Sequence, residues 1–164
     1  MAKISDSLAG SKNALAFLDM LAWSEGTSTS KHTHNDGYDV IVGGIDSPNI
    51  FTSYADHPGV LVTVNRKGLR STAAGRYQQM KKDWPHYRDL LKLPDFSPIS
   101  QDKLALQHIQ ECRALPDVHA GRIAAAIAKC RNIWASLPEA GYGQREHKLN
   151  DLIACYIAAG GRLT

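Results

Sequence analysis

The sequence lacks several features that would assign a protein quickly to a class. No stretch approaches the roughly 18 uncharged apolar residues of a membrane span, and the first ten residues hold no apolar run long enough for a secretory signal. The three cysteines are few and form no C-x-x-C pair, which argues against a disulfide framework and a thiolate zinc site. We therefore expect a soluble protein, made in a reducing cytoplasm.

The common ligand and catalytic motifs are also missing. There is no G-x-G-x-x-G or G-x-x-x-x-G-K-[ST] loop for phosphates, no H-E-x-x-H and no G-x-S-x-G. The net charge of +3 is too small by itself to indicate nucleic acid binding. These absences disfavour nucleotide-dependent enzymes, zinc proteases, serine hydrolases of that type and nucleic-acid-binding proteins.

What is present fits one ordinary domain. The 164 residues are 43% hydrophobic and 21% charged, so we expect a single domain over residues 1–164, with residues 1–10 as a loose N-terminal tail. Residues 61–164 hold most of the basic side chains, while residues 1–60 are acidic on balance. Solvated helix faces explain this distribution, and so does a surface that attracts an anionic polymer.

Apolar spacing predicts an α+β protein. The clearest helix covers residues 11–24, where Ser11 suits the N-cap and Gly26 the C-terminal stop. β-rich segments at 38–42, 50–54 and 60–64 predict one small antiparallel sheet. Further helices are expected at 72–84, 85–92, 97–112, 120–134 and 147–159, with a break in the 120–134 helix near Cys130 and Arg131. Helices around one early sheet are typical of the α+β class.

Glu25 occupies an unusual place for a carboxylate. It follows Trp23 and Ser24 at the expected C-terminal end of the first helix. The negative end of the helix dipole and an apolar neighbour both disfavour its charged form, so both would raise its pKa. A raised pKa suits a general acid. An exposed glutamate at a frayed helix end is the alternative interpretation.

One cluster resembles metal ligands. His32, His34 and Asp36 lie in a polar loop, and His57 is a possible third imidazole. A catalytic metal needs three protein ligands and supporting hydrogen bonds, whereas a polar loop needs neither. We therefore expect no metal site and no cofactor.

Two glycine-bearing segments pair tyrosine with glutamine, as Tyr77–Gln78 and as Tyr142 and Gln144. Tyrosine offers a flat apolar face, and glutamine offers an amide donor and acceptor. That combination suits the binding of a sugar ring. Each of these residues can equally be part of the core or of an ordinary loop.

Long strings of the sequence resemble the lambda-type phage endolysins. The resemblance runs in order from about residue 14 to residue 161, nearly the whole chain. The matching strings are 17–27 (FLDMLAWSEGT), 37–44 (GYDVIVGG), 71–72 (ST), 74–78 (AGRYQ), 95–98 (DFSP), 132–138 (NIWASLP), 140–144 (AGYGQ) and 146–148 (EHK). Departures are Ala73 in place of glycine, a longer 45–50 segment and a longer N-terminus.

The resemblance implies a lysozyme-like α+β fold with a cleft between the sheet and the helical part. Members of the family are soluble lytic transglycosylases, which cut the β-1,4 bond between N-acetylmuramic acid and N-acetylglucosamine in peptidoglycan and leave a 1,6-anhydro sugar. They use no metal, and the resemblance places the catalytic acid/base on Glu25. Expected substrate-binding residues are Asp39, Tyr77, Gln78, Tyr142 and Gln144, with residues 141–144 as a lid.

Three alternatives remain open. A hydrolytic lysozyme would pair Glu25 with Asp36 or Asp39. Another family of phage lysozymes places Asp nine positions after its Glu and Thr six further on, but His34 and Val40 occupy those positions here. A glycan-binding module without catalysis and a metal amidase using histidines are the other two.

The expected partners are peptidoglycan glycan strands and, by family, a holin. We expect a monomer without nucleic acid or membrane partners. By the same resemblance, the protein stays in the host bacterial cytoplasm until a holin opens the inner membrane and lets it reach the cell wall.

Overall fold

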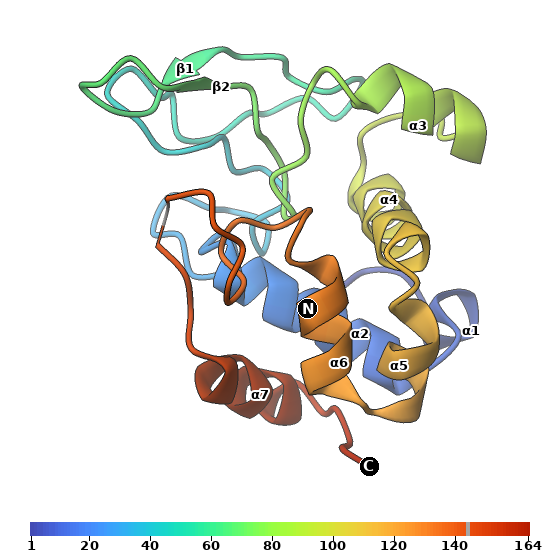
Figure 1. Ribbon diagram of the computed structural model, residues 1–164. Coiled ribbons are helices and arrows are strands. Elements are labelled where there is room, and N and C mark those ends of the chain that lie inside the picture. Colours follow the sequence, from blue (N-terminus) through green and yellow to red (C-terminus); the bar gives the residue numbers. More distant parts are fainter. Residues whose placement is uncertain (144) are drawn as a thin grey trace. The chain divides into compact units, whose positions relative to one another are not determined.

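The computed structural model describes residues 1–143 and 145–164, which divide into two compact units. Unit 1 comprises residues 1–25 and 102–164, and unit 2 comprises residues 26–101. The elements in chain order are α1 (Asp6–Ala9), α2 (Lys12–Ser24), β1 (Val62–Thr63), β2 (Arg70–Ser71), α3 (Trp84–Leu91), α4 (Pro98–Glu111), α5 (Leu115–Ala120), α6 (Ile123–Cys130) and α7 (Leu149–Ala158) (Figure 1). None of the helices in the described residues is long and apolar enough to span a membrane.

Helix α2 is the centre of unit 1 and contacts α1, α5 and α7. Its side chains are buried almost all round, as expected for a helix surrounded by others. The Ser11 hydroxyl accepts the Ala14 N–H at 3.1 Å, and Gly26 follows the helix in the left-handed region at φ 71°. The helix predicted at 11–24 and both of its end signals are therefore confirmed.

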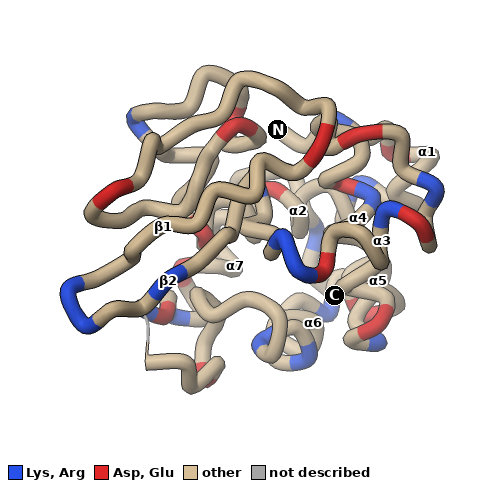
Figure 2. Tube along the Cα trace, turned by 90° about the horizontal axis from the view of Figure 1, so that it is seen from above, with Lys and Arg blue, Asp and Glu red and all other residues tan. Residues whose placement is uncertain are grey.

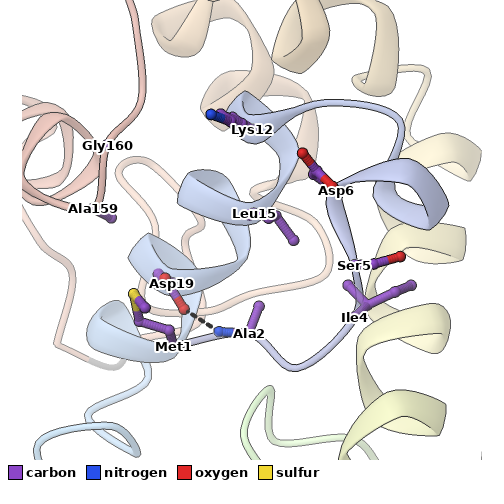
Figure 3. Close-up of a pocket in the computed structure, with 10 residues that line it drawn as sticks. All are labelled: Met1, Ala2, Ile4, Ser5, Asp6, Lys12, Leu15, Asp19, Ala159 and Gly160. Carbon is purple, nitrogen blue, oxygen red and sulfur yellow. Dashed lines mark hydrogen bonds between the residues drawn. The ribbon is translucent and has the colours of Figure 1, made fainter.

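Residues 1–10 are anchored to unit 1. The N–H of Ala2 donates to Asp19 at 2.7 Å, and Figure 3 shows this bond beside α2. One carboxylate oxygen of Asp102 accepts the N–H groups of Lys3 and Ile4 at 2.7 and 2.8 Å. Residues 6–9 form α1, and the Ile4 side chain is buried. The segment expected to be a loose tail is thus held by backbone hydrogen bonds.

Three of the later helices follow the sequence pattern. α3, α4 and α7 begin and end within two residues of the expected ranges. The helix expected over 120–134 is wrong at its start, while the break expected near Cys130 and Arg131 is confirmed. Gly121 adopts φ 77° and ends α5, whose first turn contains Pro116, and a second helix, α6, then runs only to Cys130. Proline favours a helix start and left-handed glycine a helix end.

The β structure of unit 2 is smaller than predicted. β1 and β2 pair antiparallel, with Val62 opposite Ser71. The expected strands at 38–42 and 50–54 contribute only isolated bridges, Val40 to Ile50 and Ile41 to Ala74. The antiparallel sheet exists, but β2 lies beyond the range in which the sequence placed it.

The expected helix over 72–84 does not form. Ala74 and Gln79 exchange both backbone hydrogen bonds, at 3.0 and 2.9 Å, so the chain reverses between them. Gly75 and Gln78 have positive φ values of 80° and 52°, which right-handed helices exclude. The Gln101 carboxamide accepts the Arg76 N–H at 2.8 Å, so a side chain distant in sequence supports the turn.

Lysine and arginine side chains do not gather in one segment. Figure 2 colours the lysine and arginine positions along the Cα trace, and they occur in both units, including the turn that joins β1 and β2. Arg66 and Lys67 lie exposed in that turn, and Arg70 begins β2. This distribution is typical of solvated faces, the simpler of the two interpretations of the charge pattern.

Candidate active site

Glu25 is the residue at which α2 ends. It forms the C-cap of the helix in a right-handed conformation, and its N–H donates to the Leu21 carbonyl at 2.9 Å. Its side chain is half-buried. The helix therefore fixes the backbone of this carboxylate without enclosing its side chain completely.

Ser136, a buried serine distant in sequence, binds the Glu25 carboxylate. The Ser136 hydroxyl lies 2.6 Å from Oε1 of Glu25 and 3.0 Å from the hydroxyl of Ser24. The Ser24 hydroxyl in turn lies 2.8 Å from the Leu21 carbonyl oxygen, one helical turn back. Glu25 is thus attached to a row of two hydroxyls that leads to the backbone of its own helix.

The surroundings favour the protonated form of Glu25. Burial raises the pKa of its carboxyl above the ordinary value, and the hydrogen bond from Ser136 opposes that shift. Burial disfavours a charge because water no longer solvates it, whereas a donor stabilises the carboxylate. The direction agrees with the expectation from the sequence, with burial as the main cause.

His147 connects the end of α2 to the segment that carries Ser136. Its backbone N–H donates to the Ser136 carbonyl at 2.9 Å, and its ring Nε2 lies 3.1 Å from the Ser24 carbonyl oxygen. Its ring also packs on Trp23, with centroids 4.6 Å apart. Because that carbonyl can only accept, Nε2 carries the proton.

The segment between α6 and α7 is closed by one carboxylate. Glu146 accepts the backbone N–H groups of Glu139 and Gly141 at 2.8 and 2.9 Å, and these bonds lower its pKa. Tyr142 is 55% exposed, and its hydroxyl donates to the Asn132 carbonyl at 2.8 Å. Gln144 lies outside the described residues. A substrate contact at either residue stays a prediction.

Asp39, in unit 2, shapes its own loop. Its two oxygens accept the Thr33 hydroxyl at 2.5 Å and the His34 N–H at 2.8 Å, and the residue is buried. Asp36 is exposed and has a positive φ of 51°. Asp39 therefore acts as a loop-stabilising carboxylate here, and its contact with substrate stays a prediction.

Tyr77 and Gln78 lie in the tight reversal after Ala74. Tyr77 is 1% exposed, and its ring meets Tyr38 edge-on at 6.4 Å. Gln78 is half-buried, and its side-chain amide donates to the Gly75 carbonyl at 3.1 Å. Tyr77 is thus packed as a core residue, while Gln78 keeps part of its side chain accessible.

The histidines considered as metal ligands are separated by their environments. His32 and His34 are exposed. His57 is buried, its Nε2 lies 2.8 Å from the Gln79 carbonyl oxygen, and its Nδ1 accepts the Gly59 N–H at 3.0 Å. Both ring nitrogens of His57 are therefore engaged, and burial lowers its pKa. Within the described part of the chain, no three metal-ligating side chains come together.

Sequence reasoning assigned no role to Ser136 or His147. They lie 111 and 123 residues from their partners Glu25 and Ser24, so no local spacing connects them. Both belong to strings that match the family resemblance, which was the one signal available.

Comparison with known proteins decides the family. The Endolysin family model matches residues 15–163. The chain belongs to the endolysin family. Endolysins of Escherichia phage P2 and Escherichia phage lambda are each 59% identical to it, over 155 and 147 residues. These matches cover 92% and 89% of this chain and 94% and 90% of the two relatives.

Solved structures agree with the endolysin assignment. Bacteriophage lambda lysozyme complexed with a chitohexasaccharide has a TM-score of 0.89 and 54% identity to this endolysin, with full coverage of both chains. A second structure, lysozyme from bacteriophage lambda, has a TM-score of 0.83 and 52% identity, again with 100% coverage of each. The lysozyme-like α+β fold and the family resemblance are confirmed.

Proposed function

We propose that this endolysin is a peptidoglycan lytic transglycosylase in which Glu25 is the single acid/base. The observation that carries the proposal is the environment of Glu25: a half-buried carboxyl with a raised pKa and one hydroxyl donor. Such a group holds its proton at a pH where a solvated glutamate has lost it. A general acid for glycosidic bond cleavage needs that property.

In the proposed reaction, neutral Glu25 gives its proton to the glycosidic oxygen. The C1–O bond breaks while positive charge develops on the muramyl ring. The Glu25 carboxylate then takes the proton of the C6 hydroxyl of that same ring, and the oxygen closes on C1. Glu25 ends protonated again, and no water is consumed. Attack from within the substrate gains from proximity.

This scheme requires no second protein carboxylate. Hydrolytic glycosidases use two, about 5–5.5 Å apart for a covalent intermediate and about 6.5–9.5 Å apart for direct attack by water. Asp36 and Asp39 are the sequence candidates for that role, and both oxygens of Asp39 accept hydrogen bonds from residues 33 and 34. Its engagement in the loop supports the single-carboxylate scheme.

The proposed substrate is the β-1,4-linked glycan strand of peptidoglycan. A structure similar to this one, lambda lysozyme, is a complex with a chitohexasaccharide, and chitin oligosaccharides share the β-1,4 linkage and the N-acetyl groups. We propose Gln78 and Tyr142 as its first contacts, because both keep accessible side-chain surface. Asp39, Tyr77 and Gln144 remain predicted contacts.

Digestion of purified sacculi in heavy-oxygen water tests the reaction type. Transglycosylation yields 1,6-anhydromuramyl ends, lighter than hydrolysis products by one water and free of the label. Hydrolysis places heavy oxygen at C1 and yields reducing ends. Mass spectrometry of the released muropeptides separates the two. Labelled reducing ends as the main product would overturn the proposal in favour of a hydrolytic lysozyme.

We further propose that the endolysin waits in the host cytoplasm until a holin opens the inner membrane. Expression in cells with and without a holin tests this dependence. Lysis is expected only when both proteins are present, and lysis by the endolysin alone would contradict it.

A further inference from the structure

The oxygen atoms behind Glu25 form a row with three hydrogen-bonding distances, one more than the two protons that the serine hydroxyls can donate. Three gaps separate Glu25 Oε1, the Ser136 hydroxyl, the Ser24 hydroxyl and the Leu21 carbonyl, at 2.6, 3.0 and 2.8 Å. Each hydroxyl has one proton to donate. The two serines therefore supply two protons for three hydrogen bonds.

Neutral Glu25 completes the row. With its proton on Oε1, it donates to Ser136, Ser136 donates to Ser24, and Ser24 donates to the Leu21 carbonyl. Every gap then holds one proton. When Glu25 is neutral, both buried serine hydroxyls therefore have hydrogen-bond partners. A buried polar group without a partner would cost folding free energy.

The ionised form is satisfied by turning both hydroxyls around. Ser136 now donates to the carboxylate, and Ser24 donates to Ser136. The Leu21 carbonyl loses the Ser24 proton but keeps the Glu25 backbone N–H, which it accepts at 2.9 Å. The same atoms, without any change of position, thus suit both charge states.

We propose that Ser136, supported by Ser24, is a positioning residue whose hydroxyl switches from accepting to donating as Glu25 passes its proton to the substrate. The inference rests on the proposed role of Glu25 as acid/base. Ser136 faces Oε1. The proton that neutral Glu25 holds on this oxygen turns to the glycosidic oxygen as it is passed on, and Ser136 then donates to the same oxygen. A backbone N–H in its place could only donate and would suit only the carboxylate.

Other ionisable groups close to the row act on the backbone. His147 binds the Ser24 carbonyl, and Glu146 binds the N–H groups of residues 139 and 141. Ser136, by contrast, forms its hydrogen bond with the Glu25 carboxyl itself. Because a hydrogen bond to a charged oxygen is stronger than one to a neutral oxygen, loss of the Ser136 hydroxyl should raise the pKa of Glu25 further.

Ser136→Ala tests the switch directly. We expect kcat to fall about ten- to a hundredfold, the size of one hydrogen bond to a charged group, with little change in KM. The alkaline limb of the pH–rate profile should move to higher pH. Ser136→Thr, which keeps the hydroxyl, should restore both. Ser136→Cys, nearly equal in volume, replaces Ser136→Ala if the alanine variant fails to fold.

Ser100→Ala is the matched control. Ser100 is also buried, and its hydroxyl donates to a carboxylate, that of Asp95, at 3.2 Å. Its loss should lower thermal stability and leave the pH profile in place. If Ser136→Ala changes stability alone, as this control does, Ser136 is merely structural and the inference is overturned.

Carbon-13 NMR of labelled glutamate carboxyls separates this inference from the proposed function. The Glu25 titration should move to higher pH in Ser136→Ala, and this readout does not depend on which product forms. An unchanged titration would overturn the role of Ser136 even if anhydro products appear. Hydrolytic products would overturn the transglycosylase proposal and leave the NMR result standing.

Discussion

The ring Nε2 of His147 lies 3.1 Å from the carbonyl oxygen of Ser24, the residue before Glu25, the proposed acid/base. Carbonyl groups in the last turn of a helix have no partner within the helix, and here a histidine from the segment before α7 supplies one. The same residue holds Ser136 through its backbone N–H. One residue thus fixes the two segments that meet at Glu25.

Replacement of His147 by alanine should therefore affect stability and activity together. It removes a hydrogen bond and the ring packed on Trp23, which together stabilise the fold by about 1–3 kcal/mol. Urea unfolding measures the loss. His32→Ala, at an exposed loop histidine, should leave stability and rate as they are. An equal effect of both substitutions would contradict this role for His147.

Glu25→Gln should abolish most of the activity and preserve the fold. The amide keeps an oxygen for the Ser136 hydroxyl but cannot deliver a proton, and general acid–base catalysis typically contributes about 10²–10⁴-fold. Turbidity clearing of permeabilised Gram-negative cells measures the rate, and circular dichroism checks folding. Glu111→Gln on α4 provides the comparison at an accessible glutamate. Clearing at the parental rate by Glu25→Gln would remove Glu25 from the mechanism.

The same substitution should change how stability depends on pH. Burial raises the pKa of Glu25 in the folded protein, so the unfolded chain releases this proton at a lower pH than the folded one. The free energy of unfolding of the parent therefore falls as pH rises from the unfolded pKa through the folded pKa. In Glu25→Gln, position 25 does not titrate, so this fall in the free energy of unfolding with rising pH is absent.

Thermal unfolding at two pH values gives the measurement. The Tm of Glu25→Gln minus that of the parent should be small at a pH below the ordinary range of glutamate and larger at neutral pH. A difference that shrinks as the pH rises would mean that the folded state favours the carboxylate, the opposite of what burial produces.

Sequence patterns were reliable where local interactions decide the structure. The α2 helix has a serine N-cap, apolar side chains at helical spacing over three turns and a glycine after its end. All of these signals lie within residues 11–26. The position of Glu25 followed from those signals alone. Its pKa direction followed as well, since an apolar helix end excludes water.

Patterns failed where distant side chains decide. Residues 72–84 contain good helix formers, but Gln101 and the left-handed Gly75 and Gln78 turn the chain back. The contacts of Ser136 and His147 with the end of α2 are equally nonlocal, and no periodicity reports them. The sequence placed Asp39 at a turn. It did not show that both carboxylate oxygens accept hydrogen bonds from residues 33 and 34 within the loop.

The turn at Gly75 gives a further stability prediction. Gly75 has φ +80°, and a Cβ there would collide with the Gln101 carboxamide. Gly75→Ala should destabilise the protein by about 1–3 kcal/mol, the usual cost of a strained backbone conformation. At Gly43 a Cβ meets nothing within 4 Å, so Gly43→Ala should cost much less. Chemical denaturation of the two variants compares them, and equal losses would contradict the steric argument.

The attachment of the first residues to Asp102 bears on how this endolysin can be fused to other polypeptides. Asp102 accepts hydrogen bonds from main-chain amides, so the identity of the side chain at position 3 matters little to this attachment. Met1 is 77% exposed and offers a natural point for joining an affinity tag or a targeting peptide. Deleting residues 2–4 to shorten such a fusion would instead remove the Lys3 and Ile4 amide donors from the buried Asp102 carboxylate, so engineered versions should lengthen this terminus and not trim it.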